Sequence, residues 1–191
     1  GHGTGVLRME DVDFDIDHPL RIHTHKRLPI PPRYLFVGLY RSDPDLDYYL
    51  DLDTPGGEPS VVRFPRSGPG TRYFYFAYDS LPEMLFSLAF RTIRMPRLPY
   101  QRSYGPGDWP VDAPKGAAME KLDALVEKLG FQKLSFVGNT APCYERGNAA
   151  ISGYEPDAFG FSINVAAESD IEAKRLGALL EDHMGIQFSP D

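Results

Sequence analysis

The sequence predicts an α+β fold, in which a mostly antiparallel sheet carries flanking helices and the chain ends in a helix–strands–helix segment. Three observations support this prediction. Short runs rich in aromatic and β-branched residues, separated by turn residues, dominate the chain as far as Tyr78. Two stretches alternate acidic with apolar residues, as strands do. Two later segments combine an N-terminal capping sequence with an apolar helical stripe.

Acidic residues occupy nearly every second position in the ranges 11–17 and 45–53. In an extended strand, successive side chains point to opposite faces. Each stretch is therefore predicted to bury one apolar face and to expose a row of carboxylates. The carboxylates that we expect on this exposed surface, and that are candidates for contact with a partner, are Asp13, Asp15, Asp47 and Asp51.

Four aromatic or Val-rich segments are predicted strands. Their ranges are 34–40, 46–52, 60–64 and 73–78. The segments between them are short and rich in Pro, Gly, Ser and Asp, which are typical turn residues. Because parallel neighbours would need longer crossovers, these connections predict an antiparallel meander.

A helix is predicted to follow and to end near Pro96. Ser80 is a favourable N-cap, Pro82 lies in the first turn where its missing N–H costs nothing, and Glu83 completes a capping box. Three arginines between positions 91 and 97 lie at the C-terminal end, where positive charge complements the helix dipole.

The Pro- and Gly-rich passage 96–116 is predicted to break any regular element. It separates a strand-rich region, residues 1–105, from an α+β region, residues 106–191, although the two could also pack as one domain. Trp109 lies in this passage. Such an aromatic residue anchors a loop to the core or is an exposed contact for a partner, so Trp109 is a fifth candidate site residue.

The last third combines helical and strand patterns. The predicted elements are a helix at 117–129 ended by Gly130, strands at 134–137, 144–154 and 159–165, and a helix capped by Ser169 and Glu172 and ended by Gly185.

The chain of 191 residues has a net charge of −7, which is unevenly distributed. Thirteen basic residues balance thirteen acidic ones through Gly105, whereas seven basic residues accompany fourteen acidic ones from Pro106 onward. This distribution argues against nonspecific nucleic-acid binding, which needs clustered positive charge, and is compatible with a basic partner. An apolar run of 18 residues occurs nowhere, so no membrane helix is expected.

No local motif for catalysis, metal binding or cofactor binding is recognisable. A calcium loop would need glycine where Ile16 or Leu50 stands, and His23 and His25 lack a third zinc ligand at motif spacing. The single cysteine, Cys143, lacks a nucleophile signature and cannot form an intramolecular disulfide, which favours a cytoplasmic location. We therefore expect no metal, no cofactor and no catalytic residue.

The segments 46–52, 56–57, 61–64 and 76–85 form an acidic–aromatic strand, a Gly turn, a Val-rich strand and an aromatic strand leading into a capped helix. In this order, residues 31–90 resemble the SUKH superfamily, which contains bacterial toxin-immunity proteins and yeast cell-wall-synthesis regulators. The resemblance implies an α+β domain with a mostly antiparallel sheet that binds a protein rather than catalysing a reaction.

Three hypotheses of function follow. In the first, the protein is an immunity protein that neutralises a cognate bacterial toxin, and its carboxylates meet a basic toxin such as a nuclease and accelerate association. In the second, it is a regulatory or scaffold interaction domain. In the third, it is an enzyme or small-ligand binder whose site comes together only in three dimensions.

Overall fold

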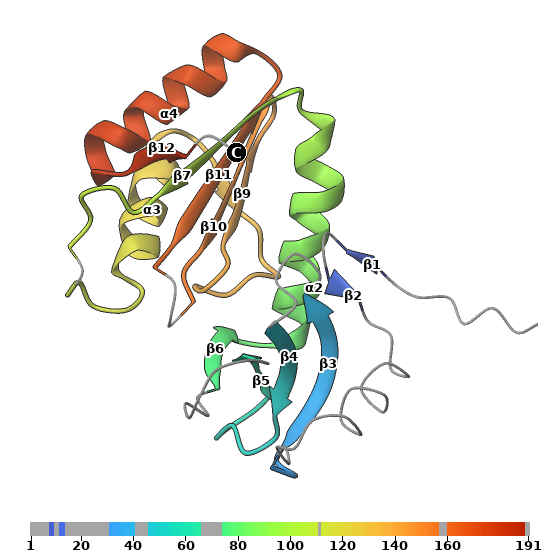
Figure 1. Cartoon of the computed structure of the whole chain (residues 1–191). Helices are drawn as coiled ribbons and strands as arrows, with labels where there is room; N and C mark the ends of the chain where they lie inside the picture. The colour runs from blue at the N-terminus through green and yellow to red at the C-terminus, as the bar shows by residue number, and fades with distance from the viewer. Residues whose placement is uncertain are drawn as a thin grey trace, which may run out of the picture. The chain divides into compact units, whose positions relative to one another are not determined.

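The computed structural model describes residues 8–9, 12–13, 31–40, 46–65, 74–110, 112–156 and 160–189. The chain divides into two compact units, Gly1–Leu81 and Pro82–Asp191. Each unit contains an antiparallel sheet (Figure 1), and among the described residues the first helix, α2, begins at Leu81. The α+β class predicted from the sequence is confirmed.

The sheet of the first unit is a meander in which every strand pairs with the next one along the chain, in the order β1-β2-β3-β4-β5-β6. The strands are β1 (Arg8–Met9), β2 (Val12–Asp13), β3 (Tyr34–Tyr40), β4 (Leu46–Asp51), β5 (Ser60–Pro65) and β6 (Tyr75–Tyr78). The antiparallel meander and the positions of β3 to β6 agree with the sequence prediction.

An aromatic cluster fills one face of this sheet. Tyr49 and Val62 are directly paired across β4 and β5, and both are buried. Tyr34, Phe36 and Phe74 pack against them. The ring of Tyr49 meets those of Phe36 and Phe74 edge-on, with centroids 5.6 and 5.9 Å apart, which is the geometry that the aromatic quadrupole favours.

The sheet of the second unit has the strand order β12-β7-β11-β10-β9-β8. Its strands are β7 (Tyr100–Gly105), β8 (Gln132–Lys133), β9 (Cys143–Arg146), β10 (Ala149–Tyr154), β11 (Ser162–Ala167) and β12 (Gln187–Ser189). Its helical segments are α2 (Leu81–Ala89), the π-helical turn η1 (Phe90–Arg94), the 3-10 turn η2 (Met95–Arg97), α3 (Ala117–Lys128) and α4 (Asp170–Met184).

Helices cover both faces of the second sheet (Figure 1). On one face, Ile151, Ile163 and Val165 pack in a large core with residues of α3 and α4. On the opposite face, the sheet contributes small residues to a second cluster, in which the helical stretch η1–η2 supplies the large side chains. The buried members of this second cluster are Phe90, Met95, Leu98, Cys143, Ala150 and Ala166.

Three sequence predictions in this unit are corrected by the structure. The passage 96–116 was expected to be irregular, but it contains strand β7, which pairs with β11 and β12. The side chain of Tyr104 is buried in the core, and the Pro and Gly residues lie only at the ends of the strand. The predicted strand 134–137 is a turn after the short strand β8. The segment 144–154 forms two strands joined by the two-residue turn Gly147-Asn148, since Arg146 pairs with Ala149.

The helix ends follow the predicted capping chemistry at α4. The Ser169 hydroxyl accepts a hydrogen bond from the Glu172 N–H at 3.2 Å, and Gly185 ends the helix with a φ of 70°. The cap of α3 instead comes from a distant segment: the Glu155 carboxylate accepts the N–H groups of Gly116 and Met119 at 3.1 and 3.2 Å. This cap could not be inferred from local sequence.

We predict that Gly177→Ala destabilises the second unit. A Cβ at this position of α4 would lie 1.8 Å from the buried Tyr104 hydroxyl and 2.8 Å from its Cζ. Helix propensity alone would favour alanine by about 1 kcal/mol. Overpacking should outweigh this and lower the free energy of unfolding by about 1–3 kcal/mol. Trp109, the single tryptophan, lies in this unit, so its fluorescence during urea unfolding is the measurement.

The matched control is Tyr104→Phe combined with Gly177→Ala. Removing the hydroxyl relieves the shorter of the two contacts, so the double variant should recover part of the lost free energy of unfolding. A Gly177→Ala variant that is more stable than the wild type would contradict the packing described for α4 on β7.

Candidate functional site

The carboxylate of Asp47 is buried, with 1 % of the residue exposed, so the prediction of an exposed acidic row is wrong at this position. Positions 47, 49 and 51 of β4 lie on the same face of the strand. Tyr49 and its aromatic neighbours cover that face, and the Tyr49 hydroxyl donates to Asp47 Oδ2 at 3.5 Å. The face that carries the acidic residues is therefore a packed face.

Asp51 lies at the end of the same strand, and its carboxylate is used within the first unit. Arg33 donates from Nε to Oδ1 at 3.1 Å and from Nη2 to Oδ2 at 2.5 Å, and only 14 % of the Asp51 side chain is exposed. The hydrogen bond to Asp51 raises the pKa of Arg33 above its ordinary value. This fork-like pair ties the start of β3 to the end of β4.

The other candidate residues are less completely placed. The backbone of Asp13 belongs to β2 and pairs with Leu39, whereas Asp15 lies outside the described residues. Trp109 is half-buried: its ring meets Phe161 edge-on at 5.4 Å, and the Lys121 ammonium lies 5.3 Å from its centroid. Trp109 thus anchors the connection between β7 and α3. A partner contact at these residues stays a prediction.

We predict that Asp47→Ala destabilises the first unit more than Asp53→Ala does. The Asp47 substitution removes a buried carboxylate together with the hydrogen bonds it accepts, which costs about 1–3 kcal/mol. The Asp53 side chain is 65 % exposed, so its truncation should cost little. Hydrogen exchange in peptides that cover β3 to β5 measures the difference. Equal exchange in the two variants would contradict a structural role for Asp47.

Cys143 lies in the small-residue face of the second sheet and is fully buried. Burial raises the pKa of its thiol to about 12, so the side chain is a neutral thiol at physiological pH rather than a nucleophilic thiolate. Within the part of the chain that the structure describes, no three His, Cys, Asp or Glu residues are grouped so that they could hold a metal ion. His23 and His25 lie outside that part.

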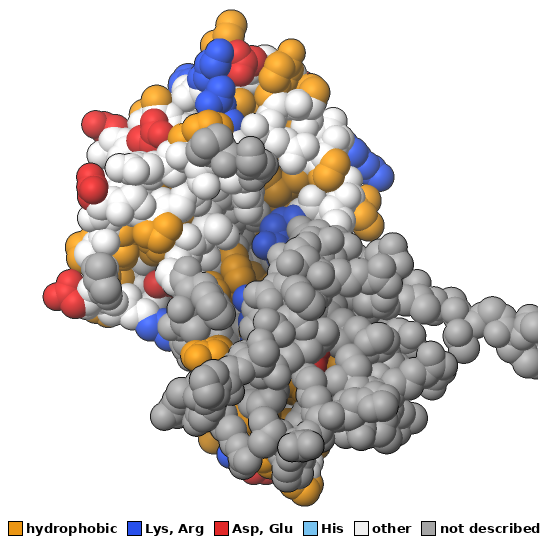
Figure 2. Space-filling view, in the orientation of Figure 1, with side chains coloured by type: hydrophobic (Ala, Val, Ile, Leu, Met, Phe, Trp, Pro, Cys, Tyr) orange, Lys and Arg blue, Asp and Glu red, His pale blue; other side chains and the backbone are white. Residues whose placement is uncertain are grey.

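A cavity of about 460 Å³ lies on the second unit, between the helical stretch α2–η1–η2 and the turn that follows β8. We call it the α2 groove. The residues that line it are Phe86, Ala89, Phe90, Ile93, Arg94, Arg97, Leu134, Ser135, Phe136 and Glu145. In Figure 2, hydrophobic and basic side chains lie next to one another on the edge of the molecule over the helical stretch. The groove combines an apolar lining with a few charges.

The helical wall of the groove is a stripe at helical spacing. Its residues recur every three or four positions from Phe86 to Arg97, so they share one side of the helix. The helix widens at η1, where the Met95 N–H bonds to the Phe90 carbonyl five residues earlier. Single π-helical turns of this kind are frequent at functional sites.

Two large apolar side chains at the groove are exposed to solvent. Phe136 is 74 % exposed and Ile93 is 55 % exposed. The Phe136 ring lies 5.8 Å from the Phe86 ring across the groove. Exposed apolar side chains that gather around a concave surface are typical of a binding site, whereas scattered ones carry no such meaning.

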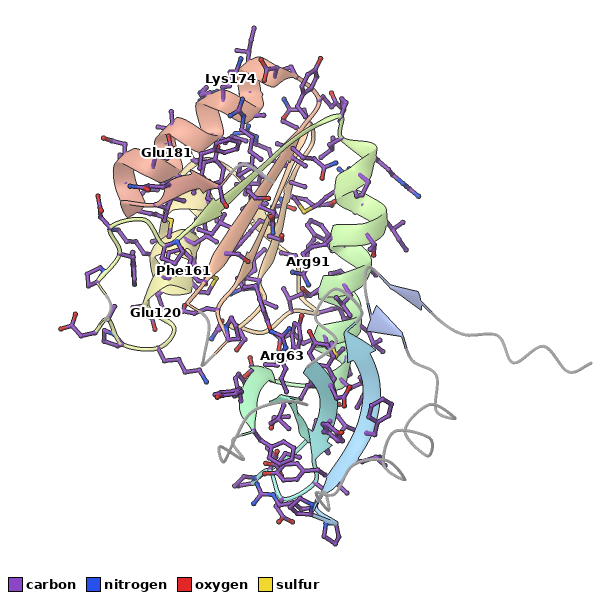
Figure 3. All side chains as sticks on the ribbon, in the orientation of Figure 1. Arg63, Arg91, Glu120, Phe161, Lys174 and Glu181 are labelled. Carbon is purple, nitrogen blue, oxygen red and sulfur yellow. The ribbon has the colours of Figure 1, made fainter. Side chains whose placement is uncertain are left out.

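The arginines at the end of this helical segment have three different environments. Arg91 points toward the sheet, with its guanidinium 5.6 Å from the Tyr154 ring (Figure 3). Arg94 lines the groove and pairs with Glu145 at 2.5 Å. Arg97 also lines the groove, is exposed, and has no ion-pair partner among the residues described. Counting only the described residues, one positive charge of the groove lining therefore lacks an ion-pair partner.

This groove was not predicted from the sequence. The arginines were expected to complement the helix dipole, and Phe136 was expected to lie in a strand. One signal was present: between Leu81 and Met95 the apolar residues cover more than half of the helix circumference and leave one polar stripe of Glu83, Ser87, Arg91 and Arg94, so the apolar surface is wider than one packed face needs.

Comparison with known proteins adds no assignment. No family model matches the chain, and neither a curated protein nor a solved structure matches it. None of the described helices has both the length and the apolar character that crossing a membrane requires.

Proposed function

We propose that this chain is a non-catalytic protein-binding domain and that the α2 groove is its contact surface. The observation that carries the proposal is the open apolar groove with Phe136 and Ile93 exposed at its rim. Aromatic side chains are enriched in protein interfaces, and a few side chains that become buried at the centre of the contact supply most of the free energy of binding.

The openness of the groove favours a protein over a small molecule. Small-ligand sites typically bury about 70–90 % of their ligand's surface. A groove whose rim residues are this exposed offers a broad contact instead. Its one carboxylate, Glu145, pairs with Arg94, and the buried Cys143 is a neutral thiol. Neither group is poised as a nucleophile or a general base, which supports a binding role for the groove rather than a catalytic one.

The resemblance of residues 31–90 to the SUKH superfamily supports a more specific proposal: the partner is a bacterial toxin, which this protein neutralises by covering its surface. The acidic net charge of −7 would help a basic toxin to approach. The described carboxylates Asp47 and Asp51 are used within the first unit, so they support the fold rather than the contact.

The test uses two matched substitutions. Ile93→Asp places a charge in the groove, whereas Ile171→Asp places the same charge on α4, where Ile171 is 80 % exposed. Each variant is co-expressed with every candidate toxin found at the same locus, and growth and co-purification are measured. Loss of a central apolar contact should weaken binding at least about thirtyfold for Ile93→Asp. Ile171→Asp should protect like the wild type.

Trp109 fluorescence during urea unfolding checks that both variants are as stable as the wild type. Complexes that tolerate both Ile93→Asp and Phe136→Asp would show that the groove is not the contact surface. Binding through the groove to a housekeeping protein, with no protection against any neighbouring toxin, would support the binding domain and overturn the immunity function.

A further inference from the structure

We propose that the α2 groove accommodates an acidic amphipathic α-helix of the partner, whose apolar side chains contact Phe86 and Phe136 and whose carboxylate pairs with Arg97. This inference rests on the proposed function and identifies the chemistry of its partner. Three features of the groove carry it: the form of its walls, their length and their charge.

The walls favour a helix over an extended strand. An added strand needs a sheet edge with free backbone N–H and C=O groups. The α2 groove is formed instead by one side of a helical stretch and a turn, and its lining includes no residue of the edge strand β8. Such a surface presents side-chain ridges and the spaces between them. A second helix fits this surface by placing its own ridges in those spaces.

The length of the groove matches a short helix. Its helical wall extends from Phe86 to Arg97, which corresponds to about 17 Å at the rise of an α-helix. A partner helix of about three turns covers this distance and presents apolar residues at positions i, i+4 and i+7. Ile93 lies between the two ends of this wall and contributes to the contact from its middle.

The charge of the groove selects an acidic partner segment. Glu145 already pairs with Arg94, so it offers no free partner to a basic side chain. Of the two cations that line the groove, Arg97 is the one without an ion-pair partner among the described residues, and it lies at one end of the stripe. A carboxylate at this end and apolar residues toward Phe86 would fix the direction of the bound helix.

The probe is a display library of random 16-residue peptides, selected on the immobilised full chain and counter-selected on the Ile93→Asp variant. We expect enriched peptides with apolar residues at helical spacing and an Asp or Glu near one end. Fluorescence anisotropy then measures the affinity of one such peptide for three chains: the wild type, Arg97→Glu, and Arg175→Glu. The last changes the net charge equally on α4, where Arg175 is exposed and pairs with Glu172 outside the groove.

Arg97→Glu should lower the affinity for the acidic peptide on the order of tenfold, because an attraction between exposed charges becomes a repulsion. Arg175→Glu should leave its affinity unchanged. Replacing the peptide's carboxylate by lysine should restore binding to Arg97→Glu. Such a recovery of affinity requires that residue 97 lies next to the exchanged side chain of the peptide. It would not occur if Arg97 only supported the fold.

Failure of this inference is distinguishable from failure of the proposed function. Peptides that depend on Ile93 but lack an acidic residue, or that bind in an extended form, would overturn the acidic helix and leave the groove as the contact surface. A selection that yields no Ile93-dependent peptide also overturns this inference. The co-expression assay with Ile93→Asp and Ile171→Asp decides the proposed function independently.

Discussion

The α2–η1 segment packs on the second sheet through a face that is built from small residues. Cys143, Ala150 and Ala166 are all completely buried, and their short side chains leave room for Phe90 and Met95 of the helical stretch. Met84 and Leu88 of α2 are buried as well, whereas Ile93 on the other side of the helical stretch is exposed. The unequal size of the residues on the two sheet faces thus determines which side of the helix becomes the α2 groove.

The same constraint explains the different roles of the charges near the groove. Arg91 points to the sheet and lies over Tyr154, Arg94 pairs with Glu145 of β9, and Arg97 lies beyond the packed region. Of these three arginines, Arg97 is the one that neither pairs with nor stacks on another described residue, and it is the charge that we propose for the partner. In the first unit, the charged side chains of β4 have partners within the unit. Arg33 pairs with Asp51, and Asp47 is buried beneath aromatic side chains.

Local chemistry allowed much of the fold to be predicted. The meander follows from short turns between aromatic strands, and Ser169 and Gly185 mark the ends of α4 because capping depends on a few neighbouring residues. Features that depend on distant partners could not be predicted. Strand β7 is defined by its pairing with β11 and β12, and the N-terminus of α3 is capped by Glu155. The alternation of acidic and apolar residues in the sequence correctly placed the carboxylates of β4 on one face of the strand. It could not show that Tyr49 and its aromatic neighbours cover that face.

In the proposed complex, the partner binds the α2 groove rather than the acidic strand face of the first unit. Hydrogen–deuterium exchange of the full chain, alone and with the co-purified partner, distinguishes these two surfaces. We expect slower exchange in the complex within residues 86–97 and 134–136, and unchanged exchange within residues 46–53. Slower exchange confined to residues 46–53, with the groove unchanged, would show that the partner binds the strand face instead.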